Sequence, residues 1–319
     1  MQIRDLTPMQ VAYWAGRNHG NDAVGVSSHL YMEFEGACLD TRRLRAALAH
    51  LMNRHPILGM RINDADRMIV DEEGGCLDLD VDCCVAFEES ELHGFLNEKR
   101  RRWTHRRMNL RKENPVAFSL SLLPEGRSRL HVDVDMLAID PFSARLMMIE
   151  LASLYCRDAS PSIECSPGKV PMFFEWLDRM ATDPSMKKKW DDDRSWWKKR
   201  LADMPDPISL PSEAMEENGA GRRDISTSIT AALDKQVSIA LKGCARQMGV
   251  TMPALLLTVF SLIMAHACKT RDFLIPLPVF WRDGVTSGAN GMLGEFANIL
   301  HVPMSVRDQD SFRAAASRT

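Results

Sequence analysis

The stretch from Leu130 to Tyr155 switches from a strand period to a helical period, and it constrains the fold more than any other feature. Residues 130–136 alternate, with Leu130, Val132, Val134 and Met136 on one side and His131, Asp133 and Asp135 on the other. A period of two predicts a β-strand with one buried face. From residue 142 the helical period predicts a buried stripe of Phe142, Leu146, Ile149 and Ala152. Such a junction can hold side chains rigidly over a cleft.

Two carboxylates, Asp135 and Asp140, lie on either side of the switch. One interpretation is that they form the acidic wall of an active site. The other is structural: Asp140 before Pro141 is a good N-cap followed by a proline at the first helical position, and Asp133 and Asp135 are solvated groups of an amphipathic strand. The residues alone leave both interpretations open.

Composition narrows the function classes. The chain has 319 residues, of which 45% are hydrophobic and 26% charged, with a net charge of −3, so no overall field favours nucleic acid or an anionic membrane. The basic clusters at 100–102 and 187–189 have acidic neighbours, which favours solvated helix faces over docking of an acidic partner. No apolar run approaches a membrane span. Eight cysteines without metal-ligand spacing predict reduced thiols, a cytoplasmic location and no bound metal.

Periodicity, caps and turn residues predict the remaining elements. Helices are expected at 6–17, 41–53, 90–107, 173–181, 187–203 and 231–248, with a further helix capped by Thr251. Strands are expected at 28–35, 57–62, 67–70, 116–123, 128–136, 224–229 and 272–280, and another within 294–306. The loop at 283–291 is polar and contains glycine, which predicts mobility.

The segment from Asp158 to Pro171 contains three prolines, three serines and a glycine without periodicity, which is typical of a linker. We therefore expect an N-terminal lobe at 1–160, a linker at 161–171 and a C-terminal lobe at 172–319. The second lobe has few strands, and a helix opening at 310–318 reaches the last residue. This pattern predicts that the C-terminal lobe is incomplete, or truncated.

Several stretches in order together resemble one family. They are LTPMQVAYWAGR at Leu6–Arg17, RHPIL at Arg54–Leu58 and DMLAIDPFS at Asp135–Ser143, with further matches at Trp197–Pro205 and Val250–Thr258. The chain resembles the heterocyclization (cyclization) domains of nonribosomal peptide synthetases, a branch of the condensation domains. The matches run from residue 6 to about residue 300.

The resemblance implies an α/β fold, an α+β sandwich of two chloramphenicol-acetyltransferase-like lobes in a V. It implies an acyltransferase that joins a carrier-bound acyl group to a carrier-bound Cys, Ser or Thr and then closes a thiazoline or oxazoline ring. Substrates would arrive on the phosphopantetheine of upstream and downstream peptidyl or aryl carrier proteins, with no cofactor bound by the chain itself. Siderophore assembly is one setting associated with the family.

The resemblance also assigns roles to residues. Asp135 and Asp140 occupy the places of the two signature carboxylates, with Ser143 in the same motif, and the second carboxylate is expected to be held by an arginine. Arg282 is the preferred partner and Arg61 the other candidate. Met136 stands where ordinary condensation domains have their catalytic histidine.

Other positions depart from the family pattern. PLPVFWR at Pro276–Arg282 and LGEFANIL at Leu293–Leu300 place Pro278 and Ala297 at threonine positions, Trp281 at an asparagine position and Glu295 at an aspartate position. Gly59 replaces an expected arginine. A glutamate can still act as a general acid or base, so Glu295 joins Asp135 and Asp140 as a catalytic candidate, whereas proline offers neither hydroxyl nor N–H.

These replacements are compatible with amide formation and put ring closure in doubt. The alternative is a catalytically silent scaffold or truncated remnant that only docks carrier proteins. An acyltransferase that uses coenzyme A would keep the fold, but the histidine motif of ordinary condensation domains is absent.

Overall fold

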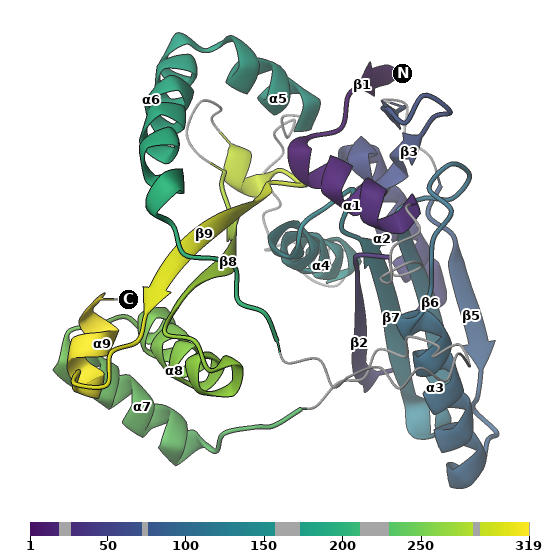
Figure 1. Cartoon of the computed structure of the whole chain (residues 1–319). Helices are drawn as coiled ribbons and strands as arrows, with labels where there is room; N and C mark the ends of the chain where they lie inside the picture. Colours follow the sequence, from purple (N-terminus) through teal and green to yellow (C-terminus); the bar gives the residue numbers. More distant parts are fainter. Residues whose placement is uncertain (19–26, 72–75, 157–172, 211–229, 283–287, 319) are drawn as a thin grey trace, which may run out of the picture. The chain divides into compact units, whose positions relative to one another are not determined.

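The computed structural model describes residues 1–18, 27–71, 76–156, 173–210, 230–282 and 288–318 (Figure 1). The chain divides into two compact units: Met1–Lys187 with Phe280–Asn298, and Lys188–Val279 with Ile299–Thr319. This division differs from the predicted boundary at 161–171, because residues 173–187 and the later segment 280–298 belong to the first unit. The predicted linker and the strand predicted at 224–229 lie outside the described residues.

The larger sheet of the first unit has the order β2-β7-β6-β5. Its strands are β2 (His29–Ala37), β5 (Leu79–Cys83), β6 (Val116–Leu123) and β7 (Arg127–Asp135). The strands predicted at 116–123 and 128–136 are present as β6 and β7, and they form an antiparallel hairpin through the 3₁₀ turn η2 (Pro124–Gly126). Strand β5 pairs with β6 in parallel. A smaller antiparallel sheet has the order β1-β4-β3, from Gln2–Arg4, Met68–Val70 and Arg61–Ile62.

Helices of the first unit are α1 (Pro8–Asn18), α2 (Thr41–Arg54), α3 (Glu89–Thr104), α4 (Pro141–Cys156) and α5 (Phe173–Thr182), with a 3₁₀ turn η1 (Pro56–Gly59). Helix α2 begins where Asp40 accepts a hydrogen bond from the Arg43 N–H at 2.8 Å, as predicted. Helices α2 and α4 pack together (Figure 1). They share one hydrophobic core with the sheet, including Leu48, Leu51, Leu120, Val132, Val134 and Met147.

Strand β7 does not have a single buried face, so this prediction was wrong. His131, Asp133 and Asp135 are as buried as the valines on the other side. The reason is that α3 packs on this polar side: Lys99 pairs with Asp82 and donates to Ser119 at 2.6 Å. The apolar side faces the core, and the polar side is buried by hydrogen bonding instead of by hydrophobic contact.

His131 shows how this polar layer is satisfied. Its Nε2 lies 3.1 Å from the Ser121 hydroxyl and its Nδ1 lies 2.7 Å from the Tyr31 hydroxyl. Burial, followed by the positive charge of Lys99, lowers the pKa of His131 to about 4. The imidazole is therefore neutral at physiological pH and serves as a hydrogen-bonding bridge between strands.

The predicted buried stripe of α4 was also wrong. Phe142 is 38% exposed and Ile149 is 53% exposed, whereas Ser143, Ala144, Met147 and Leu151 are buried. Because apolar residues surround most of this helix, the period alone does not select the side that meets the core. The hydrogen bonds of Asp140 and Ser143, described below, determine that side.

The second unit contains α7 (Lys235–Met248), α8 (Met252–Cys268) and α9 (Phe312–Arg318). Helix α6 (Pro184–Arg200), followed by η3 (Leu201–Asp203), passes from the first unit to the second. Strands β8 (Asp272–Phe280) and β9 (Ala297–Ser305) form a two-stranded sheet. A short turn, η4 (Ala289–Gly291), precedes β9. The core of the unit contains Ala265, Phe273, Ile275 and Met304.

The cap predicted at Thr251 is confirmed, whereas the helix expected from residue 231 begins later, at Lys235, with Asp234 as its cap. Asp234 accepts from the Val237 N–H at 2.8 Å to begin α7, and Thr251 accepts from the Ala254 N–H at 3.2 Å to begin α8. Among the described residues, no single helix is long and apolar enough to cross a membrane; α7 and α8 together meet that test by length and composition, with a bend of 97° between them.

Candidate active site

Asp135 lies at the end of β7 and is 1% exposed. Its carboxylate forms an ion pair with the buried guanidinium of Arg17 on α1. The Ser27 hydroxyl donates to Oδ2 at 3.0 Å, and the Leu137 N–H donates to Oδ1 at 3.1 Å. Both oxygens of this carboxylate therefore accept hydrogen bonds from buried donors. The residue therefore joins α1 to the end of β7.

Asp140 is completely buried at the start of α4. Its Oδ1 accepts from the Ser143 N–H at 2.6 Å, which is an N-cap bond, and its Oδ2 accepts from the Phe296 N–H at 3.1 Å. Arg282 lies 3.1 Å from Oδ1. The capping interpretation of Asp140 is confirmed, and the same carboxylate also anchors a distant segment through the Phe296 N–H.

Arg282 is the partner that the family resemblance led us to prefer for Asp140. Its Nη2 donates to the Ser143 hydroxyl at 2.6 Å, and its Nη1 donates to the Met292 carbonyl at 2.7 Å. The guanidinium also lies over the rings of Phe142 and Phe296, at 4.5 and 4.1 Å from their centroids. Arginine suits this position because its planar fork serves several acceptors and stacks on rings at once.

Ser143 completes this junction from α4. Its hydroxyl donates to the Gly294 carbonyl at 2.7 Å and accepts from the Gly294 N–H at 3.1 Å. The segment that contains Glu295 is therefore fastened to the first turn of α4 by its backbone.

Arg61, the other predicted partner of Asp140, lies elsewhere, so this candidate is corrected. It belongs to β3, where its guanidinium donates to Asn114 at 3.5 Å. It lines a cavity of about 490 Å³ together with Gly59 and Met52.

Glu295 is 3% exposed, and the described residues give it one hydrogen bond, from the Ala297 N–H to Oε1 at 3.0 Å. Burial raises its pKa to about 8; the negative charge of Asp140 adds to this effect, while the Ala297 N–H and Arg282 oppose it. Glu295 thus retains its proton at neutral pH. A carboxyl group that holds a proton at neutral pH can act as a general acid.

Tyr13 was not singled out from the sequence, where the N-terminal helix was interpreted as core packing. It lies on α1, partly buried against the core. Burial, followed by the negative charges of Glu295 and then Asp140, raises its pKa to about 12. The sequence contained one indication of Tyr13, which is its place in the family motif LTPMQVAYWAGR at Leu6–Arg17.

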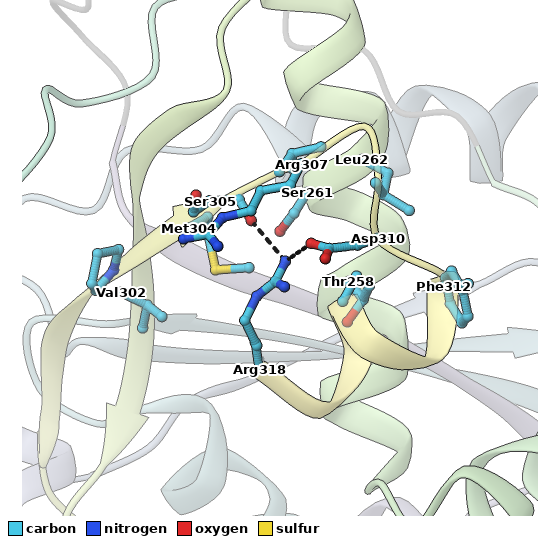
Figure 2. Close-up of a pocket in the computed structure, with 13 residues that line it drawn as sticks. Thr258, Ser261, Leu262, Val302, Met304, Ser305, Arg307, Asp310, Phe312 and Arg318 are labelled. Atoms are coloured by element: carbon cyan, nitrogen blue, oxygen red, sulfur yellow. Dashed lines mark hydrogen bonds and ion pairs between the residues drawn. The ribbon is translucent and has the colours of Figure 1, made fainter.

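A further cavity, of about 280 Å³, lies in the second unit between α8, β9 and α9 (Figure 2). Arg318 pairs there with Asp310 and donates to the Ser305 carbonyl at 3.4 Å. The hydroxyls of Thr258 and Ser261 donate to carbonyls of their own helix. Among the described residues, no group of three His, Cys, Asp or Glu side chains could hold a metal ion.

The fold and the site define an α/β protein in which a strand-to-helix turn and a returning segment enclose a buried ion pair and a protonated glutamate. The family model of the condensation domain matches residues 2–319, and the chain belongs to this family. The resemblance inferred from the motifs and the α/β fold class are confirmed.

The curated relatives are much longer than this chain. The chain is 34% identical over 297 residues to phenyloxazoline synthase MbtB of Mycolicibacterium paratuberculosis, covering 92% of this chain and 24% of that protein. It is 27% identical over 313 residues to pyochelin synthetase PchE of Pseudomonas aeruginosa, covering 98% of this chain and 21% of that protein. The chain thus spans about a quarter or less of the length of these relatives.

Solved structures support the fold. The EpoB cyclization-docking bidomain from Sorangium cellulosum has a TM-score of 0.81 at 22% identity, covering 99% of this chain and 62% of that chain. The first condensation domain of the calcium-dependent antibiotic synthetase has a TM-score of 0.76 at 20% identity, covering 99% of this chain and 73% of that one. At these identities the similarity establishes the fold alone.

Proposed function

We propose that the chain is an acyltransferase that forms an amide between a carrier-bound acyl group and the amine of a carrier-bound Cys, Ser or Thr. Membership of the condensation domain family supports this reaction class. The observation that carries the proposal is Glu295, a buried carboxyl group that holds a proton at neutral pH beside the Asp140–Arg282 pair.

The reaction requires two proton transfers, one from nitrogen and one to sulfur. The amine nitrogen attacks the thioester carbonyl carbon, a C–N bond forms, the C–S bond breaks, the nitrogen loses a proton and the departing sulfur gains one. Glu295 supplies the proton to the sulfur and recovers one from the nitrogen, so it ends the cycle unchanged. A general acid of this kind typically contributes about 10²–10⁴-fold to the rate.

Asp135 and Asp140 have a different role in this proposal. Both carboxylates are saturated with donors, so they position the elements around Glu295 and leave the proton transfer to it. Arg282 and Ser143 support Asp140 through the contacts described above.

Ring closure to a thiazoline or oxazoline is the second step that the family resemblance implies. Glu295 is the group that can protonate the oxygen that leaves as water. Pro278 and Ala297 have no hydroxyl group to assist. We therefore propose amide formation as the reaction and make ring closure a separate outcome of the assay.

The proposed partners are the upstream and downstream carrier proteins and adjacent synthetase domains, with substrates delivered on phosphopantetheine in the cytoplasm. The names of MbtB and PchE support siderophore assembly as the setting. The name phenyloxazoline synthase supports an aryl group as the first acyl donor to test.

The test combines the protein with a benzoyl-loaded carrier and a cysteinyl-loaded carrier, and follows the mass of the carrier-bound product. Amide mass supports the proposal, and an additional loss of one water demonstrates ring closure. Glu295→Gln, which keeps the shape but cannot transfer a proton, should lower the rate by about 10²-fold or more. Binding of both carriers without any amide, across a panel of acyl and aminoacyl groups, would leave only the docking scaffold.

A further inference from the structure

We propose that the hydroxyl group of Tyr13 donates a hydrogen bond to the carbonyl oxygen that becomes negatively charged during amide formation, the reaction in which Glu295 is the proposed acid. This inference rests on the proposed function, because it assigns a second catalytic residue to the same reaction. Four observations on α1 and its surroundings support it.

The first observation is how α1 is held. At its N-terminal end, the Gln10 side-chain amide donates to the Leu137 carbonyl at 2.7 Å. At its C-terminal end, Arg17 pairs with Asp135. One contact is to the turn that joins β7 to α4 and the other is to the last residue of β7, so α1 is fixed on this strand-to-helix junction at two points. A side chain between these two contacts is therefore held in a fixed position.

The second observation is the helical face. Gln10, Tyr13 and Arg17 are spaced by three and four residues, so they lie on one side of α1. Gln10 and Arg17 are both buried on this side. Tyr13 therefore faces the same structure that its two neighbours contact, and its ring is packed against the core.

The third observation is that the Tyr13 hydroxyl is uncommitted. The chain has three tyrosines. The Tyr31 hydroxyl lies 2.8 Å from Glu33, and the Tyr155 hydroxyl accepts from the Asp40 N–H at 2.8 Å. In the part of the chain that the structure describes, the Tyr13 hydroxyl has no such contact. A partly buried hydroxyl without an internal partner is available to a ligand.

The fourth observation is the charge balance. Asp140 is neutralised by Arg282, Glu295 keeps its proton at neutral pH, and Tyr13 is uncharged because its pKa lies near 12. The four groups together are neutral, and two of them offer a hydrogen. An oxygen that acquires negative charge is stabilised by such donors, and it meets no uncompensated anion.

The step is balanced with these two residues. Nitrogen attack forms the C–N bond and moves one electron pair onto the carbonyl oxygen, which the Tyr13 hydroxyl then stabilises. When the carbonyl re-forms, the C–S bond breaks and Glu295 gives its proton to sulfur. The proton lost by nitrogen restores Glu295. Tyr13 keeps its own proton throughout, as a hydroxyl with a high pKa does.

The kinetic test is Tyr13→Phe, which removes one oxygen and keeps the ring. In the carrier assay kcat should fall about 10²-fold, the magnitude of one lost oxyanion donor, with little change in KM or melting temperature. Tyr155→Phe is the matched control, because its hydroxyl serves Asp40, and its kcat should stay at the wild-type value. A Tyr13→Phe rate within twofold of wild type overturns the inference and leaves the proposed function standing.

A second measurement does not depend on turnover. With three tyrosines, ¹³Cζ-tyrosine labelling produces three NMR signals that Tyr→Phe variants assign. The Tyr13 signal should shift as Glu295 titrates near pH 8, and this shift should vanish in Glu295→Gln. If the Tyr13 signal does not respond when Glu295 titrates, the inferred position of Tyr13 near Glu295 is wrong. If wild-type protein forms no amide, the proposed function fails together with this role, whatever the NMR titration shows.

Discussion

Arg282 and Asp140 are 142 positions apart in the chain, and their side chains meet at 3.1 Å, almost fully buried. The pair fastens the segment that carries Glu295 to the first turn of α4. Removing one partner of a buried pair leaves the other charge uncompensated, so Arg282→Met should lower the free energy of unfolding by about 3–5 kcal/mol. Urea unfolding of the intact chain measures this.

The control for this variant is Arg127→Met. Arg127 pairs with Glu35 at 2.8 Å, and both side chains are substantially exposed. Its loss should change the free energy of unfolding by about 1 kcal/mol or less. Equal effects of the two substitutions would show that the Arg282–Asp140 pair has no special role in stability.

The charge of Asp140 also acts on Glu295. Its negative charge contributes to the raised pKa of Glu295, and the positive charge of Arg282 opposes it. Asp140→Asn should therefore lower the pKa of Glu295, and Arg282→Met should raise it further. Titration of ¹³Cδ-glutamate-labelled protein by NMR, with Glu295→Gln to assign the signal, measures both. Shifts of the same sign in the two variants would contradict this arrangement.

Glu295 makes stability depend on pH in a defined direction. Its pKa is about 8 in the folded chain, against an ordinary value of 4.5. Between these values the folded state binds more protons than the unfolded state, so stability falls as pH rises from about 4.5 to 8. The total loss should be roughly 3–5 kcal/mol. Urea unfolding at several pH values measures it.

Other groups titrate in the same window, so the comparison variant is Glu295→Gln. His131, whose pKa is about 4, destabilises the folded chain as pH falls from its ordinary value of 6.5. This effect is common to wild type and variant. The difference between the two stability curves isolates Glu295, and a flat difference from about pH 4.5 to 8 would rule out a raised pKa.

Local signals in the sequence predicted local structure well. The caps at Asp40 and Thr251 begin helices where expected, and the β6–β7 hairpin turns at Pro124–Gly126. These features depend on a few neighbouring residues and on backbone hydrogen bonds that any tertiary context preserves. The same holds for Asp140, whose capping geometry was predicted from the proline that follows it.

Long-range relationships were predictable only through the family motifs. Nothing local indicates that Arg17 is the counterion of Asp135, because 118 positions separate them. The buried polar layer under α3 was missed for a related reason: histidine and aspartate at alternate positions predict a solvated face unless a distant lysine, here Lys99, covers it. The division into units was missed because residues 280–298 return to the first unit.

Gly294 has no room for a side chain. A Cβ atom there would lie 2.4 Å from Cδ2 of Phe173. That ring is packed against Phe296 and Trp176, at centroid distances of 5.1 and 6.0 Å, so it cannot rotate away freely. Gly294→Ala should therefore lower the free energy of unfolding by about 1–3 kcal/mol, by overpacking. It should also lower the amide-forming rate, because Gly294 holds the segment of Glu295 against Ser143.

The matched control is Gly243→Ala in α7, where an added Cβ meets nothing within 4 Å. This substitution should raise stability by up to about 1 kcal/mol, because alanine favours the helix interior. Combining Gly294→Ala with Phe173→Leu tests the cause, since a smaller, flexible side chain can yield to the new methyl group. If the loss of stability arises from contact between the new methyl group and the Phe173 ring, Phe173→Leu should destabilise the Gly294→Ala variant less than it destabilises the wild type. Strictly additive effects on the free energy of unfolding would show that the Phe173 ring is not what excludes a side chain at Gly294.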